Sequence, residues 1–507
     1  MPANLSAARP SADVRATAQA GDQAAADPRR WRALVVTQLA AFMVLLDVSI
    51  VNVALPSIER GLAMPMATAQ WVVSGYALTL GLTLVPAGRL GDALGRRFMF
   101  MIALSAFVVT SALTGAAPSP GLLIAARLIQ GVAGGMLIPQ NSGLIQQLFR
   151  GAERGRAFGV LGSTVGLATA AGPVIGGLIL AVVSGRDAWR WVFYVNVPIG
   201  LVTLVLAARL VPRTTGSGWR RTDLDLAGAA LLGGGVFSLL LPLVNADSGG
   251  ISELGWLFGL AALLLAAFAW WEVRTVYRGR QPLLDPRLVR TAGYASGSAI
   301  SLVYFIGFTG IWLVLALFYQ DGLGYSPLRS GLRVTPFALG VALSAAIAGR
   351  LVSRAGRWLT VLGLAATILG LVATAAILPH LGGDAVTWAT IGPLFVAGLG
   401  GGMVTSPNMT LTLEHVPVRI GGAAGGAVQT AQRIGAAIGT AILATIYYHV
   451  VTRGGHHYST AASDAVLSAC SFILVALLIA VAELTRQGRR HAQRFAGATL
   501  PETTPHI

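Results

Sequence analysis

Three charged side chains lie deep within long apolar segments of the sequence: Asp47, Arg127 and Arg433. A charge in the hydrocarbon core of a membrane costs at least about 2.5–3.5 kcal/mol, so each needs a partner or water. Counting 1.5 Å per helical residue from the outer ends of their segments, Asp47 lies about 10 Å deep and Arg127 about 9 Å deep. We expect them at a shared depth. The two residues form either a fixed structural pair, or a pair in which the protonation of the Asp47 carboxyl group changes with its distance from Arg127.

The third charge, Arg433, lies near the middle of its apolar segment. Gln429 and Gln432 precede it at helical spacing and form a polar stripe with it on an Ala/Gly-rich helix. We expect this stripe to face a central cavity. Contact with a substrate and hydrogen bonding to the carbonyl groups of a broken helix both remain open for Arg433.

The elements that position these residues are membrane helices. The 507 residues are 55% hydrophobic and 11% charged, and the mean hydropathy is +0.70, which excludes a soluble enzyme. Fourteen apolar runs are long enough to span a membrane. Their expected limits are 33–54, 71–88, 98–116, 121–144, 157–183, 192–211, 224–244, 254–271, 293–318, 332–350, 358–379, 387–411, 421–447 and 461–484.

The distribution of arginine orients these spans. The net charge is +16 and the pI is about 11.2. All 36 basic residues are arginine. The termini and even-numbered loops hold 28 of them and the odd-numbered loops six. The positive-inside rule therefore predicts cytoplasmic termini. The basic residues then contact membrane lipid, and no nucleic-acid partner is needed to explain the charge.

An internal repeat divides the chain. Gly88–Arg97 and Gly349–Trp358 match at five of ten positions, 261 residues apart. Each follows a span that ends on the cytoplasmic side, so the sequence predicts an all-α membrane protein of six, two and six helices. The expected regions are a disordered cytoplasmic tail (1–32), a six-helix bundle (33–211), a two-helix insert with basic flanking loops (212–290), a second bundle (291–485) and a cytoplasmic tail (486–507).

Two motifs combine glycine with residues of special chemistry. In the first, Gly88 and Gly95 suit a tight turn between helices, and Asp92 suits hydrogen bonding to a neighbouring helix N-terminus. Arg96 and Arg97 suit contact with acidic headgroups or cytoplasm, and a topology signal alone would explain these two arginines. The second motif lies in span five, where a proline bends the helix and glycines allow close approach of a neighbouring helix. It predicts a hinge, and close packing of small residues is the alternative. Its residues are Gly172, Pro173, Gly176 and Gly177.

Five motifs in order resemble the major facilitator superfamily, specifically its fourteen-span drug:proton antiporter branch, across roughly residues 33–485. They are Leu46–Pro56, Gly88–Arg97 with Ala93 where a second basic residue is usual, Arg127–Gly131, Gly162–Gly177, and Trp189–Trp191 with Asn196–Gly200. The resemblance implies a multi-pass carrier of the bacterial plasma membrane that exports hydrophobic or cationic drug-like molecules for protons by alternating access. It implies proton coupling by Asp47 and Arg127 and a conformational latch at Gly88, Asp92, Gly95, Arg96 and Arg97. It also suggests a substrate cavity that includes Asn52, Gln130, Gln429, Gln432 and Arg433.

Other energy sources and chemistries fit poorly. A chain without lysine has no lysine-containing phosphate loop, so we expect an ion gradient and no cofactor. The lone Cys470 and the scattered histidines give no metal-ligand spacing. Two alternatives remain: a proton-coupled symporter of the same fold, and a membrane-embedded enzyme or sensor. The sequence does not specify any accessory envelope protein.

Overall fold

The computed structural model describes residues 29–183, 185–213, 225–245, 250–453 and 457–497. Residues 1–28 of the first expected tail and residues 498–507 of the second lie outside these ranges, as do residues 214–224 of the basic loop before the insert. The first described helix begins at Arg29 and the last ends at Gly497. Residues 29–32 and 486–497, expected in the tails, are therefore helical.

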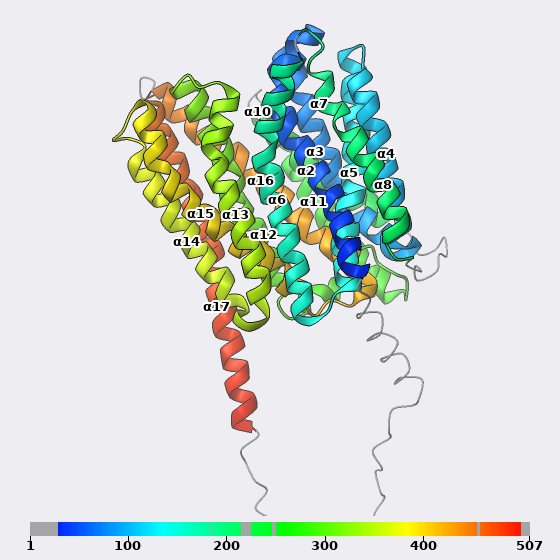
Figure 1. The fold of residues 1–507 in the computed structure, drawn as a ribbon. Helices are drawn as coiled ribbons and strands as arrows, with labels where there is room; N and C mark the ends of the chain where they lie inside the picture. The colour runs from blue at the N-terminus through cyan, green and yellow to red at the C-terminus, as the bar shows by residue number, and fades with distance from the viewer. Residues whose placement is uncertain (1–28, 184, 214–224, 246–249, 454–456, 498–507) are drawn as a thin grey trace, which may run out of the picture.

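Within the described ranges the regular elements are all helices (Figure 1). The first bundle contains α2 (Arg29–Leu62), α3 (Met66–Leu94), α4 (Arg96–Ala116), α5 (Pro120–Leu148), α6 (Gly151–Val182), α7 (Arg190–Tyr194) and α8 (Asn196–Leu210). The insert contains α9 (Leu226–Val244), α10 (Gly250–Leu254), α11 (Trp256–Tyr277) and the short η3 (Pro286–Arg290). The second bundle contains α12 (Tyr294–Leu317), η4 (Phe318–Gly322), α13 (Pro327–Ala355), α14 (Arg357–Ile377), α15 (Gly383–Thr412), η5 (Val418–Ile420), α16 (Gly421–Arg453) and α17 (Tyr458–Gly497).

Fourteen helices of the described chain are long and apolar enough to cross a membrane, which confirms the predicted number of spans. Many extend past the apolar runs: the first covers 34 residues, Arg29–Leu62, where 33–54 was expected. Backbone hydrogen bonds continue through polar flanks, whereas hydropathy detects only the apolar part of a helix. Span six is interrupted, because α7 ends at Tyr194 and α8 begins at Asn196.

The segment expected to be a loop, Gly88–Arg97, is mostly helical. Helix α3 continues to Leu94, and only Gly95 separates it from α4. Gly95 has a φ of 103°, and its repeat counterpart Gly356 separates α13 from α14 with a φ of 51°. A single glycine at positive φ therefore makes each turn, which is sharper than the expected loop.

Two helical bundles stand side by side in Figure 1, and α2 begins and α17 ends at the same end of the molecule. We call this end the terminal end and the other the opposite end. The bundles meet along two pairs of helices, α6 with α13 and α3 with α16. Helix α9 of the insert covers the second contact, where its Leu240 packs beside Leu78 of α3 and Ile434 of α16.

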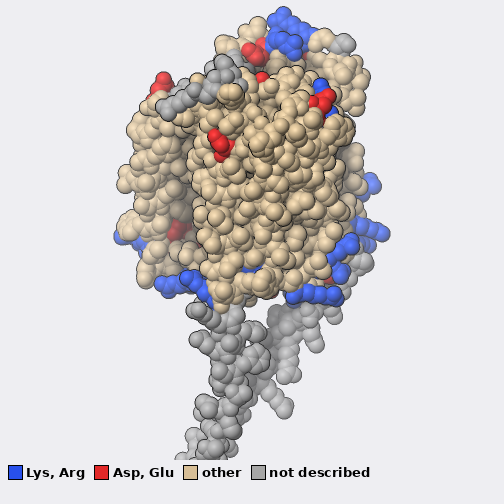
Figure 2. Space-filling view, turned by 90° about the vertical axis from the view of Figure 1, so that its left-hand side faces the viewer, with Lys and Arg blue, Asp and Glu red and all other residues tan. Residues whose placement is uncertain are grey.

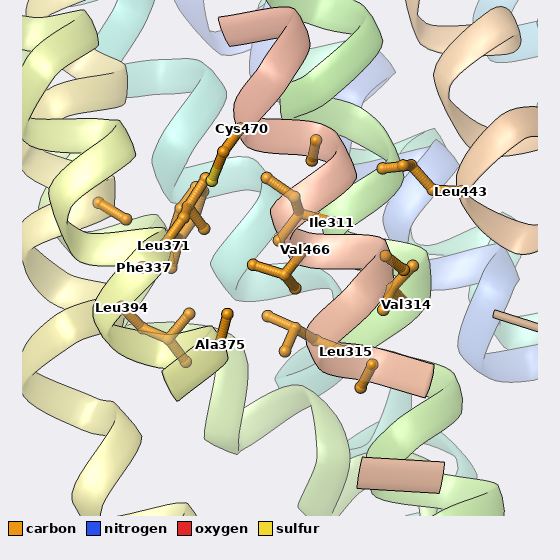
Figure 3. Packing of buried hydrophobic residues seen from close by; sticks show 14 of the residues in the cluster. Ile311, Val314, Leu315, Phe337, Leu371, Ala375, Leu394, Leu443, Val466 and Cys470 are labelled. Carbon is orange, nitrogen blue, oxygen red and sulfur yellow. The ribbon is translucent and has the colours of Figure 1, made fainter. Parts of the chain in front are cut away.

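The second bundle is held together by a continuous apolar core (Figure 3). Ile311 and Leu315 of α12 lie close to Val466 of α17, and Leu371 of α14 lies near Phe337 of α13. Burial of such side chains stabilises each by roughly 1.5–3 kcal/mol relative to exposure. This core packs the helices of the second bundle against one another.

The outer surface is suited to lipid. On the face in Figure 2 a broad band with few charged side chains lies between the two edges, and basic side chains gather at the edge near the terminal end. Large exposed apolar residues such as Leu178, Leu369 and Leu478 lie on this kind of surface. Their exposure is expected where hydrocarbon replaces water as the solvent.

Candidate functional site

The structure brings Asp47 of α2 and Arg127 of α5 into direct contact. Arg127 Nη1 lies 2.6 Å from Asp47 Oδ2, and the side chains are 1% and 0% exposed. Arg127 Nε also donates to the carbonyl oxygen of Val72, 2.9 Å away. A buried pair of this kind is stable only when its remaining polar atoms are hydrogen-bonded.

Two amide side chains satisfy that requirement. The second carboxylate oxygen, Asp47 Oδ1, accepts hydrogen bonds from Asn196 Nδ2 at 2.9 Å and Gln130 Nε2 at 3.2 Å. Gln130 Oε1 in turn accepts from Arg127 Nη1 at 2.9 Å, and Gln130 Nε2 donates to Ser111 at 2.8 Å. Asp47 of α2 thus accepts hydrogen bonds from side chains of α5 and α8. All three helices belong to the first bundle.

Local sequence explains how these groups meet. Arg127 and Gln130 are three residues apart and share one face of α5. Gly131 packs against the backbone of Tyr76, and this close approach places the Tyr76 ring 4.1 Å from the Arg127 guanidinium carbon. A ring face attracts a cation at this distance. The break before α8 puts Asn196 at the start of a helix, facing Asp47.

A separate cavity lies between the two bundles. Its volume is about 700 Å³ including the opening. It is lined by Ala41, Leu45, Leu84, Ile138, Asn141, Phe158, Leu161, Gly162, Val165, Thr405, Ser406, Met409, Gln429, Gln432 and Arg433. Asp47 and Arg127 are absent from this lining. The ion pair and the cavity are therefore distinct features in this conformation.

Three of the five residues suggested for the substrate cavity line it: Gln429, Gln432 and Arg433. Gln429 also donates to Ser142 Oγ of the first bundle at 2.8 Å, so it links the bundles. Gln130 is instead fully buried with Asp47. Asn52 lines another pocket, formed with residues of both bundles that include Pro173 and Gln320.

The motif around Asp92 joins the two bundles at the terminal end. Asp92 accepts hydrogen bonds from the backbone N–H groups of Gly422, at 3.1 Å, and Ala423, at 3.0 Å, in the first turn of α16. A carboxylate is favoured there by the helix dipole. Arg96 Nη2 pairs with Asp92 Oδ1 at 2.8 Å and also donates to the carbonyl oxygen of Val418.

The glycines of that motif fit the contact. A Cβ atom on Gly88 would overlap the carbonyl oxygen of Gly422, so only glycine allows α3 to approach α16 this closely. Gly95 makes the turn described above. Arg97 donates to the carbonyl oxygen of Ala208 at 2.6 Å, within the first bundle. Gly88, Asp92 and Arg96 thus contact the second bundle directly.

The residues proposed as a hinge lie inside the continuous helix α6. Gly172 and Gly176 face Ser49 and Ile50 of α2. Gly177 faces Leu328 of α13, and Pro173 packs against Gly331 of the same helix. This geometry is close helix packing at the junction of α2, α6 and α13, and the hinge remains a prediction.

The structure buries charged side chains beyond the three that the sequence places deep within spans. Near the terminal end Arg89, Asp92, Arg96, Arg357 and Glu272 are also buried. They lie at helix ends, where packing between helices excludes water although hydropathy marks the segment as polar. Asn196 was also missed as a partner of Asp47. Its polar side chain in an otherwise apolar span was the available signal.

The second bundle has a polar cluster of its own. Arg357, the repeat counterpart of Arg96, pairs with Glu483 of α17 at 2.9 Å and donates to Asn408 Oδ1 at 2.5 Å. Asn408 also donates to Ser301 of α12. The described residues contain no group of three His, Cys, Asp or Glu side chains that is suited to a metal ion.

Known proteins are similar in sequence to most of this chain. The puromycin resistance protein of Streptomyces alboniger is 38% identical over 83% of this chain and 82% of its own length. The probable actinorhodin transporter of Streptomyces coelicolor is 34% identical over 87% and 77%. The tetracenomycin C resistance and export protein of Streptomyces glaucescens is 32% identical over 82% and 76%. These similarities indicate a multi-pass membrane transporter and not an enzyme.

Solved structures agree on the fold. A human organic anion transporter superposes with a TM-score of 0.64 at 15% identity, covering 90% of this chain and all of that one. A proton:xylose symporter gives 0.60 at 14% identity, covering 88% and 95%. The sequence model of the Major Facilitator Superfamily matches residues 38–440, which is most of the chain. The protein therefore belongs to the Major Facilitator Superfamily.

Proposed function

We propose that the protein exports amphipathic drug-like molecules across the plasma membrane in exchange for protons. The observation that carries this proposal is the buried pair of Asp47 and Arg127, 2.6 Å apart and closed off from the cavity. Of the buried carboxylates, Asp47 lies deepest in an apolar span and depends on an arginine and two amides for its stability. Protonation would remove the negative charge to which all three groups are bonded.

In the proposed cycle, proton binding to Asp47 releases Arg127 from its ion pair. Arg127 then keeps the Val72 carbonyl, Gln130 and the rings of Tyr76 and Phe193 as partners, and α5 is free to shift relative to α2. Helix α5 also carries Ile138 and Asn141, which line the cavity. A change at Asp47 is thereby transmitted along one helix to the substrate site.

We place the terminal end in the cytoplasm, because basic side chains gather there and cytoplasmic loops carry an excess of arginine. The bonds from Asp92 to Gly422 and Ala423 then hold the cytoplasmic side closed. With the terminal end in the cytoplasm, the described conformation is closed on the cytoplasmic side and is therefore the outward-facing one. Breaking these bonds is required before cargo enters from the cytoplasm.

The names of the relatives and the walls of the cavity support a drug-like cargo. Two of those relatives are named for resistance to puromycin and to tetracenomycin C. Leu45, Ile138, Phe158, Leu161 and Met409 supply apolar surface, and amide groups supply hydrogen bonds. Such a mixture suits an amphipathic molecule.

Replacement of the central carboxylate tests the proposal. Asp47→Asn keeps the size of the side chain but removes the titrating group, so we expect loss of proton-coupled drug efflux in a pump-deficient host while the protein stays in the membrane. Asp187→Asn is the matched control, because Asp187 is an exposed carboxylate of the same bundle, paired with Arg190. Normal efflux by the Asp47→Asn protein would make the pair purely structural.

A further inference from the structure

The central cavity contains a single charged side chain, Arg433. None of the other residues that line the cavity is charged. Arg433 is half-buried, and it forms no ion pair or hydrogen bond with the described residues of the chain. Its Cβ lies close to α3 at Gly81, so the charge stands between the two bundles.

Three other buried arginines of the described chain have a carboxylate partner, and a fourth, Arg89, lies outside the cavity lining and hydrogen-bonds to Gln281. Arg127 has Asp47 at 2.6 Å, Arg96 has Asp92 at 2.8 Å and Arg357 has Glu483 at 2.9 Å. Each of these cations is neutralised where it lies. A cation left without a counter-ion in a low-dielectric site is costly, and an anion supplied from outside would offset that cost.

The surroundings of Arg433 define the rest of such a ligand. Gln432 and Gln429 flank it on α16 and supply amide groups. Phe158 and Leu161 of α6 and Ile138 of α5 form apolar walls in the same cavity. The cavity thus offers a cation and amide groups to an acidic group, and apolar walls to an aromatic or aliphatic body.

We propose that the exported cargo is an amphipathic organic anion whose acidic group, a carboxylate or an ionised phenol, binds Arg433. This rests on the proposed export function and names its substrate class. It replaces the cationic alternative expected from the resemblance, because a cation would meet Arg433 with no carboxylate in the cavity lining to balance it. Arg433 is then a specificity-determining residue that discriminates by charge.

Binding to the full chain in lipid nanodiscs tests this without any gradient. The probes share one aromatic body: anthracene-2-carboxylate, its methyl ester and its 2-(trimethylammonio)ethyl amide, with protein-free nanodiscs subtracted for partitioning. The native protein should bind the carboxylate at least about tenfold more tightly than the other two. Arg433→Gln should weaken carboxylate binding about 10-fold to 100-fold and leave ester binding nearly unchanged.

Two further variants separate charge recognition from packing. Arg433→Lys should keep the preference for the carboxylate, and Arg274→Gln, at an exposed arginine of α11, should bind all three probes as the native protein does. The proposal is overturned if the native protein binds the cationic amide as tightly as the carboxylate, or fails to bind the carboxylate. It is also overturned if Arg433→Gln weakens all three probes equally. Because no proton gradient is used, a failure of proton coupling at Asp47 would leave this result unchanged.

Discussion

Asp47 receives three side-chain hydrogen bonds, from Arg127, Gln130 and Asn196, and it has no contact with water in this conformation. Removal of one partner of a buried ion pair leaves an uncompensated charge, and this costs about 3–5 kcal/mol. Removal of both charges costs much less, because no charge is then left without a partner. The pair therefore makes a prediction about stability as well as transport.

We expect Arg127→Leu to lower the thermal unfolding midpoint markedly, and the double variant Asp47→Asn with Arg127→Leu to recover much of the loss. Unfolding in detergent, followed by tryptophan fluorescence, measures the order of the midpoints. A double variant that unfolds below Arg127→Leu alone would mean that the two side chains do not stabilise each other through charge.

At the level of single residues, the sequence predicted that Asp47 and Arg127 lie at a shared depth, because apolar runs fix how far a residue lies from the end of a span. The structure brings the two side chains into contact. The sequence did not predict Asn196 as a third partner or the pair of Arg357 and Glu483, whose members are 126 residues apart. Such contacts depend on which helices become neighbours, and no local pattern carries that information.

Helices α3 and α16 form the contact that we assign to closure of the cytoplasmic side. Asp92 provides two bonds to the first turn of α16, and hydrogen bonds to a charged group contribute about 1.5–3 kcal/mol each. A loss of even 1.4 kcal/mol changes the ratio of two conformations about tenfold. The closed state is therefore sensitive to this one side chain.

Asp92→Ala should shift the protein toward the state open at the terminal end. Spin labels at the exposed residues Phe98 and Arg419, one in each bundle, should report a longer distance by double electron–electron resonance. Ser353→Ala is the control, because Ser353 holds the repeat position of Asp92 and is exposed. An unchanged distance in Asp92→Ala would contradict the role of Asp92 in closure.

The sequence predicted every membrane helix but not the form of its ends. Apolar runs of about 20 residues are unambiguous. The turn at Gly95 and the break at Val195 depend on one or two residues each, and hydropathy averages over them. The expected loop at Gly88–Arg97 was wrong for this reason.

Across the whole molecule, the internal repeat predicts two bundles separated by a pair of helices. The two bundles also repeat a packing contact. Gly135 lies against the backbone of Leu80 in the first bundle, and Gly402 lies against the backbone of Val341 in the second. The sequence did not predict where the insert packs against the two bundles. Its helix α9 covers the contact between α3 and α16, so the insert is placed where it can respond to movement of the bundles.

The direction in which protons move with cargo tests the account most directly. Proteoliposomes that contain the full chain and a pH-sensitive dye are loaded with a compound to which the expressed protein confers resistance, and the compound is then allowed to leave. Exchange for protons predicts that the lumen of native vesicles becomes more acidic, with no such change in Asp47→Asn vesicles. A lumen that becomes more alkaline would show symport, and a lumen unchanged during transport would show that protons are not coupled; either result contradicts the account.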